Sequence, residues 1–484
     1  MTGFVSFIGA GPGRPELITL RGLQLLQRAD VVLADDLVHP EIYLRYARPD
    51  AEIIRCGKRG GRPSTPQDHV NAMILHHAGA GKRVARLKGG DTMIFGRMRE
   101  ELDAVESVAL PYEIVPGVTA ASGCSAYAGP LLTERNRARA MTFMTGTTAD
   151  GSADWAAAAR LGTLVLYMGV TGLDHHAMEL QAAGLSGDTP VTVVRWGSRG
   201  LQQQWHGPLV RIAELVREQA VRPPALVIIG AGQDSLQTLN WWTSKPLFGT
   251  TLLMFRPDER GWLLAERLRE LGCEVQNLPT RRPQALTAAE PLDPSALHVF
   301  TSAQAVPWAP VPPAGSTVLA VGPTTAQALR SRGIACQSVG TGHTASLESY
   351  LRGQVTAGRV LQHWCGEDKR AELADLCSNL PVQYRPIPVY RMLDWDFGIE
   401  VAREMIGRAP AGSIVYATSP KTCAPVAQAL RDRAKELLLW AIGDTTAHEL
   451  RKAGLAAARV LGQDGLHDHD AQLEAALREY AARG

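Results

Sequence analysis

Short apolar runs alternate with helical segments along the whole chain, and this alternation most constrains the fold. Apolar runs of strand length occur at residues 5–8, 31–33, 163–167, 225–229, 251–255 and 413–416. Between them lie amphipathic segments such as residues 263–271, where leucines recur at helical spacing until Gly272 ends the pattern. Strands that feed helices in this way are typical of α/β proteins. The sequence therefore predicts an α/β fold throughout.

An internal repeat divides the second half of the chain. Residues 321–335 return in similar form at 442–456, and residues 300–302 return at 417–419. A repeat this long and this sparse does not fit a solenoid, whose units are shorter and stack in series. We therefore expect two similar α/β lobes that face each other across a cleft.

The best domain boundary lies at residues 241–249, where Pro246 and Gly249 interrupt a helical segment before a new strand. A chain of 484 residues is long enough for about three domains, or for four small lobes. We therefore predict one domain over residues 1–244 and another over 249–484. Few contacts are expected to cross such a boundary.

Composition excludes several classes of function. Lys and Arg total 50 against 48 Asp and Glu, so no nucleic acid and no membrane surface is expected as a partner. No apolar run approaches the ~18 residues that a membrane span needs, and no signal peptide is recognisable. The seven cysteines are scattered and form no Cys-x-x-Cys motif. We therefore expect reduced thiols, a cytoplasmic protein and no metal site.

Glycine-rich segments follow several of the predicted strands, at residues 9–13, 89–91 and 115–123. The first segment is not a dinucleotide fingerprint, because Arg14 stands where the third glycine belongs and Pro12 lacks a backbone donor. By itself it is equally consistent with a tight strand-to-helix turn. In an open α/β sheet, however, ligands bind beyond the carboxyl ends of the strands. The three segments are therefore expected to converge on one crevice, where Asp91 can accept from a hydroxyl or an amine.

Residues 4–243 resemble uroporphyrinogen-III C-methyltransferase, of the tetrapyrrole (class III) methyltransferase family. The matching segments follow the family's order: 9–13, 55–59, 86–97, 115–123, 167–169 and 223–230. The resemblance implies a two-lobed fold that binds S-adenosylmethionine between its lobes and forms a homodimer through this half. It places cofactor contacts at Pro12, Gly89, Gly90, Asp91, Ile94, Thr119, Ala120, Met168 and Gly197.

The same resemblance assigns catalytic and substrate-binding roles. It places a proton acceptor at Asp35 and a donor at Lys58; the alternative for Lys58 and Arg59 is a solvated surface pair. A base is chemically reasonable, since the attack of a pyrrole carbon on the sulfonium methyl group leaves a proton to be lost. Arg97 and Arg135 match positions of the substrate site, with Glu100 one turn beyond Arg97. A substrate with eight carboxylates calls for such arginines.

Four departures from the family pattern change the charge of this half. Arg14 replaces an acid, Asp36 an arginine and Glu134 a histidine, and Met98–Arg99 replaces a glycine pair. Asp36 and Glu134 remove positive charge where carboxylates should dock. They leave open an alternative, in which the enzyme methylates a different porphyrinoid.

Residues 251–480 resemble uroporphyrinogen-III synthase. The resemblance rests on segments at 300–306, 321–329, 365–373, 389–390, 418–420 and 442–447. It implies two α/β lobes joined by two strands. The first lobe would contain residues 250–282 and 390–484, and the second lobe residues 284–388. The implied reaction closes hydroxymethylbilane with inversion of the last ring, and needs no cofactor.

That reaction needs donors around carboxylates more than it needs a nucleophile. Threonine and serine at strand ends and helix starts supply such donors. We expect substrate contacts at Thr301, Ser302, Thr325, Thr418, Ser419 and Thr446, and assistance to hydroxyl departure from Tyr390. These hydroxyls equally fit helix N-caps, because a cap and an anion site share one geometry.

Together the two resemblances predict a bifunctional enzyme of tetrapyrrole biosynthesis, in the sirohaem and cobalamin branch. It would make uroporphyrinogen III and methylate it twice, to precorrin-2. The alternative is a methylase of another porphyrinoid whose second half is a non-catalytic tetrapyrrole-binding module.

Overall fold

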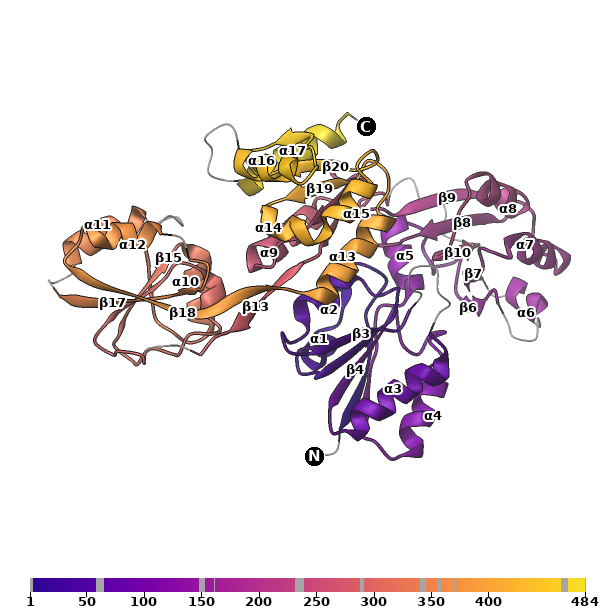
Figure 1. Ribbon diagram of the computed structural model, residues 1–484. Helices are drawn as coiled ribbons and strands as arrows, with labels where there is room; N and C mark the ends of the chain where they lie inside the picture. Colours follow the sequence, from indigo (N-terminus) through magenta and orange to yellow (C-terminus); the bar gives the residue numbers. More distant parts are fainter. Residues whose placement is uncertain are drawn as a thin grey trace. The chain divides into compact units, whose positions relative to one another are not determined.

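A computed structural model describes residues 3–57, 65–147, 153–160, 162–230, 239–287, 291–339, 345–354, 358–369, 371–462 and 469–483. The chain forms two compact units. The first contains Met1–Phe255, Leu264–Leu278 and Glu400–Gly484, and the second contains Arg256–Leu263 and Pro279–Ile399. Strands and helices alternate in both (Figure 1), so the predicted α/β fold class is confirmed.

The first sheet is fully parallel, in the order β3-β2-β4-β1-β5. Its strands are β1 (Phe4–Gly9), β2 (Val31–Ala34), β3 (Glu52–Arg55), β4 (Arg83–Lys88) and β5 (Tyr112–Val115). The helical segments are η1 (Pro15–Leu17), α1 (Leu20–Leu26), α2 (Pro40–Tyr46), α3 (Gln67–Gly79) and α4 (Met98–Ser107). α3 and α4 lie side by side (Figure 1) and bury Val70, Ile74 and Val105 in one core with Val5 and Phe7 of β1. Because the strands are parallel, their carboxyl ends meet at one edge.

The second sheet is mixed, in the order β6-β7-β10-β8-β9, and only β6 and β7 run parallel. Its strands are β6 (Met141–Thr145), β7 (Thr163–Tyr167), β8 (Pro190–Arg195), β9 (Gln203–Pro208) and β10 (Ala225–Ile229). The helices are α5 (Ala120–Ala128), α6 (Trp155–Arg160), α7 (Leu173–Ala182) and α8 (Leu209–Glu218). On α8, Leu209, Ile212 and Val216 recur at helical spacing and are buried against the sheet.

The predicted boundary at residues 241–249 is packed. Trp242 is 1% exposed, and its indole nitrogen donates to the carbonyl of Arg199 over 3.0 Å. Leu247 is fully buried in the core of the sheet that follows. This segment therefore joins the two halves of the chain within the first compact unit.

The third sheet belongs to the first unit and is fully parallel, in the order β12-β11-β19-β20-β21. Its strands are β11 (Thr251–Met254), β12 (Glu274–Asn277), β19 (Ile414–Ala417), β20 (Leu438–Ala441) and β21 (Arg459–Val460). The helical segments are α9 (Glu259–Glu270), α13 (Asp396–Arg408), α14 (Pro420–Cys423), η4 (Ala424–Val426), α15 (Ala427–Asp432), α16 (Asp444–Lys452) and α17 (His469–Ala481).

The fourth sheet builds the second unit, in the order β13-β18-β17-β14-β15-β16, with only β13 and β18 antiparallel. Its strands are β13 (Arg281–Ala285), β14 (Leu297–Phe300), β15 (Thr317–Val321), β16 (Gln337–Val339), β17 (Arg359–Gly366) and β18 (Val382–Asp394). The helical segments are η3 (Ala303–Ala305), α10 (Pro323–Ser331), α11 (Ala345–Gln354) and α12 (Glu372–Ser378). The predicted repeat appears as two matching strand–turn–helix units, β15 with α10 and β20 with α16.

Candidate active sites

The glycine-rich ends of three parallel strands meet at one edge of the first sheet. Gly11 and Gly90 exchange two backbone hydrogen bonds, of 3.1 and 2.7 Å. A Cβ at Gly117 would lie 2.8 Å from the Cα of Gly9, so the backbones approach too closely for a side chain. Gly90 also has a φ of +69°, which other residues rarely adopt. The sequence pattern thus reflects real convergence of β1, β4 and β5.

The Asp91 side chain links two of these strand ends by hydrogen bonds. Its carboxylate accepts hydrogen bonds from the backbone nitrogens of Met93, over 2.7 Å, and of Gly117, over 3.0 Å. The sequence suggested a hydroxyl or amine of a ligand as its donor. In the structure its two oxygens instead join the loop after β4 to the loop after β5.

Tyr167, at the end of β7, links the second sheet to this edge. Its hydroxyl accepts from the backbone nitrogen of Ala121, over 3.1 Å, and lies 2.5 Å from the hydroxyl of Thr119. The ring of Phe95 lies 4.9 Å from the Tyr167 ring, centroid to centroid. The loop of Ile94 therefore lies near Met168, which is 54% exposed at a φ of +55°. Sequence analysis did not select Tyr167, although it begins the Tyr167-Met168-Gly169 segment.

Helix α5 brings the remaining predicted cofactor positions together. A Cβ at Gly123 would lie 2.5 Å from the side chain of Pro12, and one at Gly197 would lie 2.5 Å from the Cys124 sulfur. Loops from both sheets thus pack on one helix. Gly89, Ile94 and Ala120 are half-buried.

A buried charge network lies beneath Asp35. An oxygen of Asp35 is 2.6 Å from Arg86, and Arg86 and Lys88 contact Glu101 over 3.2 and 2.5 Å. Burial raises the pKa of Glu101, but Arg86 and Lys88 outweigh it and the net pKa is lowered. Burial also lowers the pKa of Lys88. The sequence did not point to this network, although Arg86 and Lys88 are two cations at alternate positions near the end of a buried strand.

The other residues that are expected to bind the methyl acceptor, or to exchange a proton with it, are less enclosed. Arg97 occupies the N-cap position of α4 at a φ of +52° and pairs with Glu100 over 2.6 Å, with the two side chains 61% and 47% exposed. Arg135 is exposed in the turn that the Glu134–Ala138 bridge closes. Lys58 lies outside the described residues.

In the second unit, the predicted hydroxyls after β14 contact a buried histidine. The Thr301 hydroxyl lies 2.8 Å from Nε2 of His363, and Nδ1 of His363 lies 2.9 Å from the Tyr384 hydroxyl. Burial lowers the pKa of His363 to about 4, so its ring is neutral near pH 7. Sequence analysis missed His363, because nothing local marks it as a partner of Thr301.

Tyr390 lies on β18 in the same unit. Its hydroxyl donates to the side-chain oxygen of Gln304 over 3.3 Å, and the Ser302 hydroxyl accepts from the Gln304 backbone over 3.2 Å. Burial raises the pKa of Tyr390. Ser302 thus acts as the cap of η3, as the alternative reading of these hydroxyls predicted. Thr325, in the first turn of α10, is 4% exposed.

The remaining predicted hydroxyls lie in the first unit. Thr418 and Ser419 follow β19, and Thr446 is 6% exposed in α16. Ser419 stands at the N-cap of α14, yet its side chain makes no capping hydrogen bond there. The six hydroxyls are therefore divided, three to each unit.

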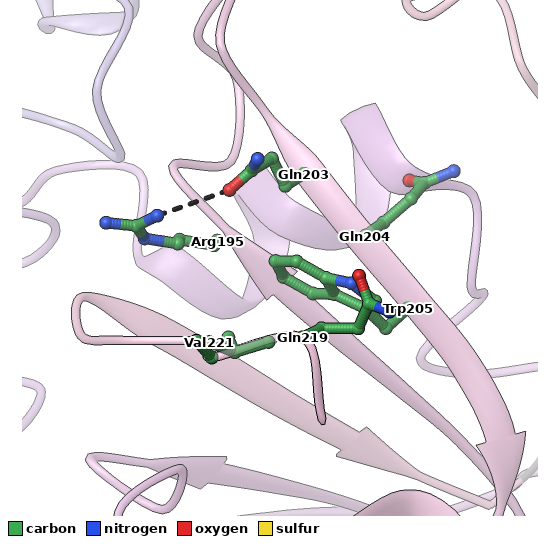
Figure 2. A pocket seen from close by; sticks show the side chains of 7 residues that line it. Arg195, Gln203, Gln204, Trp205, Gln219 and Val221 are labelled. Atoms are coloured by element: carbon green, nitrogen blue, oxygen red, sulfur yellow. Dashed lines mark hydrogen bonds between the residues drawn. The ribbon is translucent and has the colours of Figure 1, made fainter. Parts of the chain in front are cut away.

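A cavity of about 400 Å³ lies apart from these residues, at the β8–β9 hairpin and the end of α8 (Figure 2). Arg195 of β8 donates to the side chain of Gln203, its cross-strand neighbour on β9, over 3.2 Å. None of the predicted site residues lines it. Within the described residues, no cluster of His, Cys, Asp or Glu has the arrangement of a metal site, and no helix is long and apolar enough to cross a membrane.

Family comparisons account for both halves. Residues 5–213 match the model of the Tetrapyrrole (Corrin/Porphyrin) Methylases, and residues 262–463 match that of Uroporphyrinogen-III synthase HemD. The chain belongs to both families, as a fusion. The synthase half thus spans the third and fourth sheets, and the methyltransferase half the first two.

Similar proteins cover the methyltransferase half. A siroheme synthase of Pseudomonas aeruginosa (strain LESB58) is 45% identical over 244 residues, which are 50% of this chain and 52% of that protein. A uroporphyrinogen-III C-methyltransferase of Bacillus subtilis (strain 168) is 38% identical over 60% of each chain. The chain thus spans about half the length of the siroheme synthase that it matches.

A solved structure is also similar to the methyltransferase half. It is the uroporphyrin-III C-methyl transferase of Thermus thermophilus, complexed with S-adenyl homocysteine. The two are 37% identical over 48% of this chain and 99% of that chain, with a TM-score of 0.42.

Proposed function

We propose that the chain carries out two consecutive steps of tetrapyrrole biosynthesis. The synthase half closes hydroxymethylbilane to uroporphyrinogen III, and the methyltransferase half methylates that product twice, to precorrin-2. The protein would act in the cytoplasm, as a homodimer through its methyltransferase half. Membership of the two families supports this pairing, because the product of one reaction is the substrate of the other.

The convergence of glycine-rich strand ends carries the proposal for the methyltransferase half. Gly90 opposes Gly11, and Asp91 ties its loop to Gly117, so bare backbone lines this edge beside Thr119 and Met168. Glycine there lets a ligand approach the main chain closely. These residues fit S-adenosylmethionine, which supplies an electrophilic methyl group when bound. The protein's part is to hold the acceptor carbon in line with that group.

Other residues are needed to remove a proton from the methyl acceptor and to bind its carboxylates. Asp35, at the end of β2, is proposed to take the proton that the pyrrole system must lose once its carbon has been methylated. Arg86 lies 2.6 Å from its carboxylate and fixes its position. Arg97 and Arg135 are proposed to bind acetate and propionate groups, and their exposure leaves them accessible to a large substrate. Substrate would have to displace Glu100 from Arg97 to bind there.

The synthase half is proposed to work by positioning a reactive substrate. The bilane loses its hydroxyl readily, so the protein must fold the chain and place its ends. Thr301, Ser302, Thr418 and Ser419 are available as donors to carboxylates. Tyr390 is proposed to donate to the departing hydroxyl, since burial keeps its phenol protonated.

One assay tests both halves together. Purified protein would receive hydroxymethylbilane and S-adenosylmethionine, and its products would be identified by mass and by isomer. We expect the type III isomer first and a dimethylated product after it. Type I isomer alone would contradict synthase activity, and would favour a non-catalytic binding module. Type III isomer without a change of mass would contradict the methylation of this acceptor.

A further inference from the structure

The two halves of the chain are joined within the first unit by buried ion pairs. Arg269 of α9 donates to both carboxylate oxygens of Glu41, over 2.7 and 2.8 Å, and to Glu16 over 2.8 Å. Glu41 is 1% exposed and Arg269 5%. The sequence predicted few contacts across the boundary, and this expectation is wrong. Buried charges of this kind tolerate the loss of a partner poorly, because the remaining charge is left uncompensated.

One set of contacts reaches the loop after β1. Arg14 directly follows Pro12 and Gly13, two residues of the glycine loop, and is 8% exposed. Its guanidinium pairs with Glu16, over 2.9 Å, and with Glu270 of α9. The loop that carries Pro12 is therefore tied to α9.

A second set reaches the loop after β8. Arg199, two residues beyond Gly197, donates from Nε to Glu274 of β12 over 3.1 Å. The other oxygen of Glu274 accepts from the backbone nitrogen of Gly200, over 3.1 Å. The Glu274 side chain is 4% exposed. Glu274 of β12 thus contacts both the side chain of Arg199 and the main chain of Gly200 in this loop.

A third set surrounds the loop that carries Asp35. Glu41 lies on α2, directly after that loop, and Arg269 of the synthase half donates a hydrogen bond to Glu41. On the other side, Arg55 lies 3.7 Å from Asp36 and donates to Glu404 of α13 over 3.1 Å. Two of the departures from the family pattern, Arg14 and Asp36, therefore lie at the junction with the synthase half.

We propose that the third sheet's lobe, through α9, β12 and α13, is a built-in clamp on the methyltransferase site. It holds in place the three loops that carry Pro12, Asp35 and Gly197. Arg14 and Asp36 then serve this docking and do not select a different methyl acceptor. The inference rests on the proposed function, because it assigns those loops to the cofactor and the proton acceptor. Arg269 and Glu274 are positioning residues in this scheme.

The physical effect of such a clamp is preorganisation. Loops that are already fixed lose less conformational entropy when a ligand binds, so affinity rises without new ligand contacts. By linkage, ligand binding must also stabilise the clamp. Both directions of this coupling are measurable.

The first experiment uses the full chain and S-adenosylhomocysteine, with affinity measured by calorimetry. Arg269→Gln removes the central pair, and we expect about a 5–150-fold weaker affinity. Arg267→Gln is the matched control. It makes the same change on the same helix, but Arg267 pairs with Glu474 and with the carbonyl of Asp470, both in the synthase half. We expect this control to bind as tightly as wild type.

The second experiment measures hydrogen exchange with and without S-adenosylhomocysteine. In wild type, we expect the ligand to slow exchange in residues 264–277, which contain Arg269, Glu270 and Glu274. If Arg269→Gln does not fold, Glu270→Gln replaces it, because the Glu270 side chain is 66% exposed. Its expected loss of affinity is smaller, about twofold to tenfold, since one exposed partner is removed.

The outcomes separate the clamp from the function beneath it. Wild type that binds the ligand, with a folded Arg269→Gln that binds equally well, overturns the clamp and leaves the methyltransferase assignment intact. Unchanged exchange in residues 264–277 on ligand binding overturns it as well. Wild type that binds no S-adenosylhomocysteine overturns the proposed function, and the clamp with it.

Discussion

The strand-end site of the methyltransferase half and that of the second unit neutralise their polar groups differently. The first buries Arg86, Lys88 and Glu101 in an ionic network beneath Asp35. The second joins Thr301, His363 and Tyr384 by uncharged hydrogen bonds. Buried ions are costly unless every partner is in place, whereas a neutral network has no charge to compensate.

The methyltransferase half and the second unit also differ in backbone strain. Among the described residues, the non-glycine residues with positive φ all lie between Phe95 and Ala220. They include Arg97, Met168 and Trp196, beside the proposed cofactor loops. Such residues cost about 1–3 kcal/mol each and persist only where the surroundings enforce them. Strained backbone thus lies beside the proposed methyltransferase site, whereas no described non-glycine residue of the second unit has a positive φ.

The largest expected effect comes from Gly90→Val, which tests that dependence directly. At a φ of +69°, valine is strained, and its side chain would enter the space beside Thr119 and Ala120. We expect this substitution to abolish S-adenosylhomocysteine binding, because the side chain fills the space that the ligand needs. Calorimetry measures it.

Gly184→Val is the matched control for that substitution. Gly184 has a φ of +96° and open space around it, so it carries the backbone strain without filling a crevice. Equal losses in the two variants would show that strain, and not a filled ligand site, explains the result.

The next effect concerns the exposed arginines. Arg97→Ala or Arg135→Ala should cost about 2–5 kcal/mol of substrate or transition-state binding, if these side chains pair with carboxylates. Affinity for S-adenosylhomocysteine should stay near wild type. Steady-state methylation, with KM and kcat separated, measures the first and calorimetry the second. Arg99→Ala is the control, because Arg99 pairs with Asp103 and Glu106 on its own helix. Lost cofactor binding with normal methylation would reverse the assigned roles.

A pH effect sharpens the contrast between charged and neutral sites. The pKa of His363 is lowered by burial to about 4 from 6.5, so below pH 6.5 the unfolded state binds a proton that the folded state does not. Stability of the second unit should therefore fall by about 3 kcal/mol as pH drops from 6.5 to 4. His363→Gln should remove this part of the slope. Hydrogen exchange of β17 and β18 at several pH values measures it, and equal slopes in both proteins would contradict the neutral network.

The smallest expected effect is that of Tyr390→Phe. It removes one hydroxyl, worth about 0.5–1.5 kcal/mol as a neutral hydrogen bond, so closure should slow by about tenfold or less. Spontaneous cyclisation to the type I isomer would then compete, and the isomer ratio is the observable. Tyr350→Phe is the control, because Tyr350 of α11 packs against a core cluster elsewhere in the same unit. An unchanged ratio in Tyr390→Phe would remove Tyr390 from the mechanism.

Sequence reasoning placed the glycine-rich loops well, because their requirement is local. The backbone at Gly90 has a positive φ and lies close to other backbone segments. Glycine accepts both conditions readily, so its presence in the sequence indicates them. It did not find Tyr167 or His363, whose roles come from partners 48 and 62 residues away. The roles assigned to the site residues, including Lys58, and the boundary of the two domains stay predictions.

The sequence by itself determined the α/β class, the repeat of β15–α10 in β20–α16 and the two families, since periodicity and motif order are properties of short segments. Only the tertiary structure decided where the charges went. Arg14 and Asp36 stood out in the sequence as departures that should affect substrate docking. In the folded chain they meet α9 and, through Arg55, α13. Pairs such as Arg269 and Glu41 join side chains 228 residues apart, and such pairing depends on packing that no local pattern encodes.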